Sequence, residues 1–193
     1  MAIRINIVDS HPNLFCDSKW WGDPELPEDL KYPMVEGVPM TFITQLSLYD
    51  LSKFDSDGLL PQEGMFYFFA DLDEFIDEAP ESVIELPRSS FAVRYTKTVN
   101  METFATVQLM DEDDEPIAPA AYPVEFEQVA DDEDGTVILG TKLPETIREA
   151  IPDAVSILSF VFAQSRFQFV LSRKDIGFGN WKRARLFVSP ISI

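Results

Sequence analysis

SKWWGDPELP at residues 18–27 begins the stretch of sequence that decides the fold, and the stretch continues through YP at 32–33 to PMTFITQL at 39–46. Two adjacent tryptophans, a glycine and four prolines restrict the backbone so strongly that residues 18–39 cannot form a regular helix or a central strand. The apolar residues that follow predict a strand over residues 41–48. We therefore expect an aromatic-rich loop that leads directly into a sheet.

Hydrophobic patterns on both sides of this loop predict a sheet protein. Residues 3–8 alternate in polarity, and residues 64–72 form a continuous apolar run typical of a strand buried on both faces, which we place at the centre of the sheet. Hairpins are predicted for 91–99 with 102–110, for 124–129 with 136–139, and for 154–163 with 167–172. One helix is predicted at 145–151, after Pro144. The fold class is therefore β-rich α+β, a single domain over residues 1–193 with a curved or packed, mostly antiparallel sheet and few short helices.

Three motifs in order carry a family resemblance: SKWWGDPELP, PMTFITQLSLYDL at 39–51 and LLPQEGMFYFFADLD at 59–73. Together they resemble the YwqG-like family, a bacterial domain of unknown function, and residues 166–188 are similar to its closing pattern. Residues 100–165 match poorly and lack the histidine element and the Trp-Gly-Asp hairpin of that family. The resemblance implies a shared fold, no established reaction, and an association with toxin genes that makes an immunity protein a concrete expectation.

Charge is distributed unevenly along the chain. The net charge is −19, with 34 acidic and 15 basic residues; residues 143–193 carry seven bases and four acids, so residues 1–142 carry −22. This sign disfavours nucleic acid or an anionic membrane as a partner and predicts a basic protein instead. The first residues read as a strand, no apolar run spans a membrane and a single cysteine excludes an intrachain disulfide, so we expect a cytoplasmic protein. The oligomeric state stays open.

Two acidic runs, at residues 111–115 and 131–134, contribute to eleven acids in 24 residues without one base. If they are neighbouring loops, they form one negative edge that attracts a basic partner; solvated loops are the alternative. A calcium site is disfavoured because the alternating ligand spacing is absent. The candidate partner-binding residues are Asp111, Asp113, Asp114, Asp131, Asp132 and Asp134.

The aromatic loop offers a second candidate site. Its indoles either line a cleft for a ligand or plug an open end of the core. The candidate ligand-binding residues are Lys19, Trp20, Trp21, Asp23 and Gln45. His11 and Cys16 are too few for a zinc site and are not expected to form a nucleophile–base pair, so we predict no catalytic residue, metal or cofactor. The leading hypothesis is a non-enzymatic module for a basic partner, with an immunity protein against a cationic toxin as its concrete form; the alternative is a small-ligand-binding protein or hydrolase.

Overall fold

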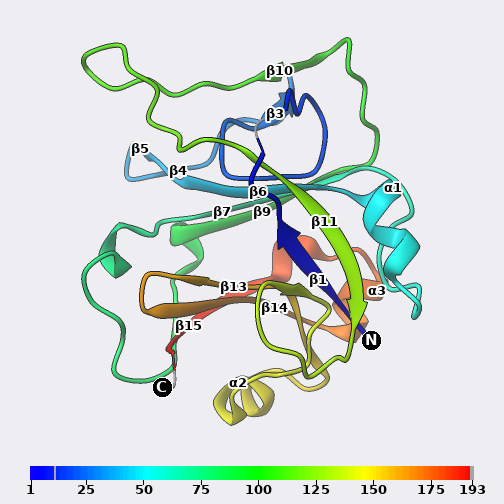
Figure 1. Cartoon of the computed structure of the whole chain (residues 1–193). Helices are drawn as coiled ribbons and strands as arrows, with labels where there is room; N and C mark the ends of the chain where they lie inside the picture. The colour runs from blue at the N-terminus through cyan, green and yellow to red at the C-terminus, as the bar shows by residue number, and fades with distance from the viewer. Residues whose placement is uncertain (11, 192–193) are drawn as a thin grey trace.

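A computed structural model describes residues 1–10 and 12–191 and arranges them around one eleven-stranded antiparallel sheet (Figure 1). Its strands, in spatial order, are β8 (Ile84–Glu85), β15 (Arg185–Pro190), β14 (Ser165–Ser172), β13 (Ala154–Phe162), β12 (Val137–Ile138), β1 (Ala2–Ile7), β11 (Tyr122–Val129), β2 (Lys19–Trp20), β6 (Thr41–Ser47), β7 (Met65–Ala70) and β9 (Phe91–Thr96). The two edge strands, β8 and β9, follow one another in the chain with only residues 86–90 between them. The sheet therefore curls until its edges approach each other.

Small elements cover the outside of this curled sheet. Two small two-stranded sheets, β3 (Glu25–Pro27) with β10 (Phe104–Thr106) and β4 (Met34–Val35) with β5 (Val38–Pro39), lie above β6, β7 and β9 in Figure 1. The helices are α1 (Leu48–Leu51), α2 (Glu145–Ala150) and α3 (Arg173–Gly177), and the 3₁₀ turns are η1 (Ser52–Phe54), η2 (Asp73–Phe75), η3 (Arg88–Ser90) and η4 (Trp181–Arg183). None of the helices in the described residues is long and apolar enough to cross a membrane.

The positions of the β7 side chains explain why the sequence of this strand is continuously apolar. Successive side chains of a strand point to opposite faces, so Phe66 and Phe68 enter the main core inside the curl, while Tyr67 and Phe69 enter a second core under the β3–β10 layer. All six residues of β7 are consequently buried. The prediction of a strand covered on both faces is confirmed, but its predicted place at the centre is wrong, since β7 is next to the edge strand β9.

The predicted mostly antiparallel, β-rich architecture with few short helices is confirmed as one continuous curled sheet. The 154–163 and 167–172 hairpin forms as β13–β14. Two predicted hairpins are wrong: β10 pairs with β3 instead of β9, and β1 lies between β11 and β12. Hairpin prediction favours strands that are neighbours in the chain, whereas here the first strand of the chain is inserted between two strands that come much later.

Candidate functional site

The aromatic loop owes its shape to two consecutive left-handed residues between β2 and β3. Trp21 has φ +57° and Gly22 has φ +80°. Gly22 is also a close-approach position, because a Cβ there would lie 2.5 Å from Cβ of Ala121. The tight turn brings the short strands β2 and β3 back toward each other, so the side chains of Lys19 and Glu25 meet.

Lys19, Glu25 and Gln45 form a buried polar cluster. Lys19 Nζ donates to Glu25 Oε1 at 2.6 Å, and Gln45 Nε2 donates to Glu25 Oε2 at 2.6 Å. The Glu25 backbone N–H donates back to Gln45 Oε1 at 3.1 Å, and the backbone N–H of Cys16 also donates to Glu25 Oε2 at 3.1 Å. The hydroxyl of Tyr67 fixes the strand by donating to the Glu25 carbonyl at 2.9 Å. A buried charge pair of this kind is held by a complete set of hydrogen bonds around the carboxylate.

The indoles belong to the core and not to a cavity. Neighbouring side chains in β2 point to opposite faces, so Trp20 packs edge-on against Phe160 with ring centroids 5.5 Å apart while Lys19 turns away. Trp21 contacts Phe162 in the same way at 6.2 Å. Of the two interpretations of the tryptophans, the structure shows the core plug.

Two adjoining hollows lie over the polar cluster. The first, which we call the polar chamber, has a volume of about 390 Å³ and includes Lys19, Asp23, Glu25 and Thr106 in its lining. The second, which we call the apolar pocket, measures about 230 Å³. It is lined chiefly by Tyr32, Val38, Met40, Phe42 and Ile117, with Asp23 and Asp73 at its sides. Gly22, Asp23, Ala118 and Pro119 line both hollows, which therefore form one cleft with a polar and an apolar part.

The structure thus brings three of the five predicted ligand residues together. Lys19 and Asp23 line the cleft, and Gln45 positions Glu25, whereas Trp20 and Trp21 lie outside its lining. Glu25 was missed by the sequence interpretation. The sequence did contain a signal for this residue: Lys19 and Glu25 flank the Trp-Trp-Gly turn. A turn of this kind reverses the chain and brings the two flanking side chains together.

Burial controls the titration of the groups around the cleft. Desolvation raises the pKa of Asp23, against the opposing effects of Lys19 and of a hydrogen bond from the Leu109 backbone. Burial, together with the negative charge of Glu25, raises the pKa of the Cys16 thiol to about 11. A thiol with this pKa is protonated at neutral pH and is not an activated nucleophile. His11, which was not expected to form a nucleophile–base pair with Cys16, lies outside the described residues.

The acidic run at residues 111–115 is exposed at the end of the cleft. Asp111 Oδ1 closes the loop by accepting from the backbone N–H groups of Asp113 and Glu115, at 2.9 and 3.0 Å. An isolated bridge joins Met110 to Pro116, and the next residue, Ile117, lines the apolar pocket. Across residues 1–10 and 12–191, none of the ion pairs involves an acid of this run.

The acidic run at residues 131–134 lies elsewhere, and two of its four acids form ion pairs. Asp134 pairs with Lys142 and with Arg166, and Glu133 pairs with Arg4 at 2.6 Å. The eight residues of β11 separate this run from residues 111–115, a length of roughly 26 Å at 3.3 Å per residue. The single negative edge expected from the sequence is therefore wrong, because an extended strand, and not a hairpin turn, connects the two runs.

Among the described residues, no three histidine, cysteine, aspartate or glutamate side chains gather closely enough to hold an ion. Glu25, the acid at the centre of the cluster, already accepts from Lys19, Gln45 and Cys16.

Comparison with known proteins adds a family. A family model described as a domain of unknown function, DUF1963, matches residues 18–155. The chain belongs to the DUF1963 family. The DUF1963 match begins at the SKWWGDPELP motif and includes the lining of the cleft except for residues 12–15. It also includes residues 100–155, which show little similarity to the YwqG-like motifs. No curated protein matches the chain.

Proposed function

We propose that this protein is a non-enzymatic binding module that captures a basic protein through the cleft and the neighbouring acidic run at residues 111–115. The observation that carries the proposal is the pairing of unneutralised acids with an accessible apolar pocket. Val38 and Ile117, which line the pocket, are each 57% exposed, and Met110 beside them is 47% exposed. A surface of this composition suits a segment that carries both basic and apolar side chains.

The two parts of the surface contribute differently. Burying one apolar side chain of a partner in the pocket would contribute about 1.5–3 kcal/mol. The exposed carboxylates act over a longer range, so they speed association and select a partner of positive charge. Because the acids are exposed, their contribution is screened by salt.

Of the six predicted partner-binding acids, the proposal retains Asp111, Asp113 and Asp114. Asp131, Asp132 and Asp134 lie at the other end of β11 and are left out of the binding surface. An immunity protein that neutralises a cationic toxin in the cytoplasm is the concrete form of such a module, and the resemblance of residues 18–73 to the YwqG-like family supports it.

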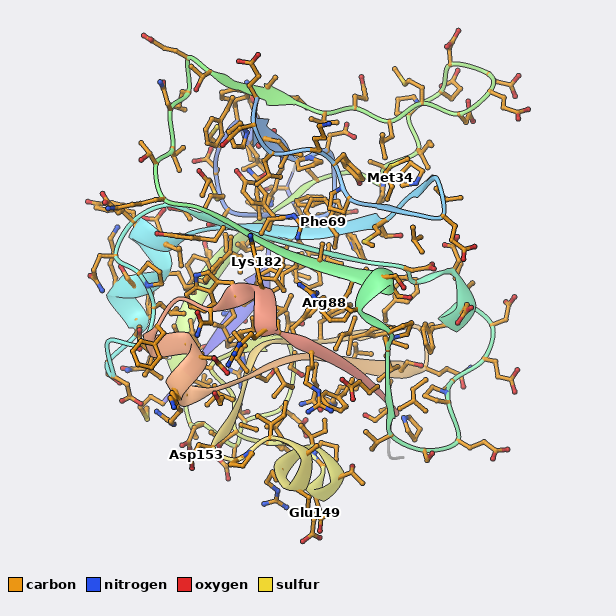
Figure 2. The ribbon with its side chains drawn as sticks, turned by 180° about the vertical axis from the view of Figure 1, so that it is seen from behind. Met34, Phe69, Arg88, Glu149, Asp153 and Lys182 are labelled. Carbon is orange, nitrogen blue, oxygen red and sulfur yellow. The ribbon has the colours of Figure 1, made fainter. Side chains whose placement is uncertain are left out.

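A pull-down from native lysate at low salt tests the proposal. The baits are the wild type, the variant D111N/D113N/D114N and the control E145Q/E149Q/D153N, which removes the same charge at the opposite end of the molecule, where Figure 2 labels Glu149 and Asp153. Asparagine at position 111 keeps the acceptor that closes the loop, so the fold is retained. The wild type and the control should retain one basic protein that about 0.5 M salt releases, since the Debye length then falls to a few ångströms. Equal capture by the D111N/D113N/D114N variant would contradict the proposal.

The polar chamber favours a second candidate function, the binding of a small polar ligand. In the described residues, Glu25 is the one hydrogen-bond partner of Lys19 Nζ, which carries three donors. With Lys19, Glu25 and Asp23 the chamber has a net charge of −1, which suits a neutral or cationic amide that accepts from Lys19 and donates to Asp23. A thermal-shift screen of amino acid amides tests this: a stabilising amide that loses its effect in D23N supports the function, and a screen without any such amide refutes it.

A further inference from the structure

A third hollow lies along the edge strand β9. Its volume is about 850 Å³. We call it the basic hollow; its lining consists of Asp29, Leu30, Lys31, Val93, Arg94, Tyr95, Gly179, Asn180, Trp181, Lys182 and Arg183. These residues come from three separate segments: the turn after β3, strand β9 and the turn η4. Figure 2 labels Lys182, one of these residues.

The charge of the basic hollow is opposite to that of the molecule. Four cations and one carboxylate line it, in a chain whose acids outnumber its bases 34 to 15. Arg183 is shared with Asp175 at 3.3 Å, but within residues 1–10 and 12–191 no ion pair involves Lys31, Arg94 or Lys182. Eight of the fifteen bases do have a carboxylate partner. The basic hollow therefore differs from the rest of the molecular surface, because three cations without a carboxylate partner line one concave region.

Arg88, which does not itself line the basic hollow, adds a positive charge that interacts with Arg94. Burial, and then the positive charge of Arg94, lower the pKa of Arg88, which precedes β9 in the turn η3. Arg88 is held in place by its own neighbour, with the guanidinium 4.6 Å from the centroid of the Phe91 ring. An anion that enters the basic hollow would relieve this repulsion.

The wall of the basic hollow is aromatic and rigid. Trp181 is only 6% exposed and packs edge-on against Phe66, with ring centroids 4.6 Å apart. Tyr95 lies 6.3 Å from Trp181 and donates from its hydroxyl to the Glu63 carbonyl at 3.3 Å. A preformed concave surface with an apolar wall and a few converging charges is the usual form of a small-molecule site.

We propose that the basic hollow binds a small organic polyphosphate, whose phosphates contact Lys31, Arg94 and Lys182 and whose organic body lies against Tyr95 and Trp181. Phosphate oxygens, like carboxylate oxygens, form strong charge-assisted hydrogen bonds with guanidinium and ammonium groups. A long nucleic acid does not suit the site, because the remainder of the chain is strongly negative and would repel it. The proposal concerns a different surface from the acidic run and does not depend on the basic partner.

Isothermal titration calorimetry at low salt with ADP, inorganic pyrophosphate and a hexaglutamate peptide tests the proposal. The variants are R94Q/K182Q and the matched control K53Q/R148Q, which removes two positive charges outside the basic hollow. Each lost charge–phosphate contact should weaken binding severalfold, so we expect R94Q/K182Q to bind ADP at least tenfold more weakly than the wild type, and the control to bind it within twofold. ADP should bind more tightly than pyrophosphate because its base contacts the aromatic wall.

Three results would overturn the proposal. One is the absence of ADP binding to the wild type at millimolar concentration, and another is equal ADP affinity of R94Q/K182Q and the wild type. The third is tighter binding of hexaglutamate than of ADP, which would assign the basic hollow to an acidic protein segment. The melting temperature of R94Q/K182Q, measured in parallel, should lie within a few degrees of the wild-type value, because the Lys182 side chain is exposed and Arg94 is only partly buried.

Discussion

Replacing Lys19 by methionine should destabilise the protein far more than an ordinary lysine substitution. The side chains of Lys19 and Glu25 are 5% and 4% exposed, and their charged atoms lie 2.6 Å apart. Methionine keeps much of the volume of lysine but leaves the Glu25 carboxylate without its cation. Removal of one partner from a buried ion pair costs about 3–5 kcal/mol. For a chain of this size about 1 kcal/mol lowers the melting temperature by roughly 2–4 °C, so K19M should melt about 6–20 °C below the wild type.

A second substitution separates the charge from the packing. Glutamine at position 25 is neutral and can still accept from Gln45 and from the Cys16 backbone, so K19M/E25Q should regain most of the stability lost in K19M.

Urea denaturation followed by tryptophan fluorescence measures both effects. Trp20 and Trp21 lie in and against the main core, next to the polar cluster, so their emission reports its unfolding. A loss below about 1 kcal/mol in K19M, or a double variant less stable than K19M itself, would refute the reasoning that the cluster is a desolvated ion pair.

Three further predictions concern other residues. Cys16 should react with iodoacetamide at pH 8 about 100-fold more slowly than a free cysteine, because a pKa raised from 9.0 to about 11 reduces the thiolate fraction by that factor; a rate near the free value in the native protein would contradict the burial of the thiol. Because the pKa of Asp23 is raised in the folded protein, its contribution to stability is present at low pH and lost as the pH rises. D23N should therefore raise the melting temperature by about 1–3 °C at pH 7.5 and leave it unchanged at pH 3. A gain of equal size at both pH values would contradict this account. Gly64→Ala should lower the free energy of unfolding by more than about 3 kcal/mol, because φ is +105° and a Cβ would lie 2.2 Å from the Thr96 carbonyl oxygen. The control Gly58→Ala, with φ +62° and open space around it, should lower it by about 1 kcal/mol in the same urea titration. Equal losses would contradict the steric argument.

Local hydrophobic patterns predicted the strands of this fold well and their pairing poorly. The alternating residues of β1, the apolar run of β7 and the β13–β14 hairpin each follow from their own sequence. The insertion of β1 between β11 and β12 depends on contacts between residues that are 117 to 135 positions apart in the chain, which periodicity does not encode. The second core explains the remaining difference, since β7 is buried on both faces near an edge only because the β3–β10 layer covers it.

Only those parts of the candidate site that lie close together along the loop and its flanking strands could be predicted from the sequence. Lys19 and Gln45 lie side by side because β2 pairs with β6, and Asp23 lines the same hollow as Lys19. Trp20 is separated from Lys19 by strand alternation, which places the two side chains on opposite faces of β2. The basic hollow was not predicted, because its cations come from three segments that meet only through the curl of the sheet.

Site-specific photocrosslinking in native lysate tests the central claim, the capture of a basic protein at the cleft, most directly. A photoreactive phenylalanine analogue replaces Ile117, which lines the apolar pocket, or Glu149 as a control on α2. The account predicts a crosslinked basic protein from position 117 and none from position 149, with the adduct lost in the D111N/D113N/D114N background. Equal adducts from both positions, or an adduct from position 117 that persists without the three acids, would contradict it.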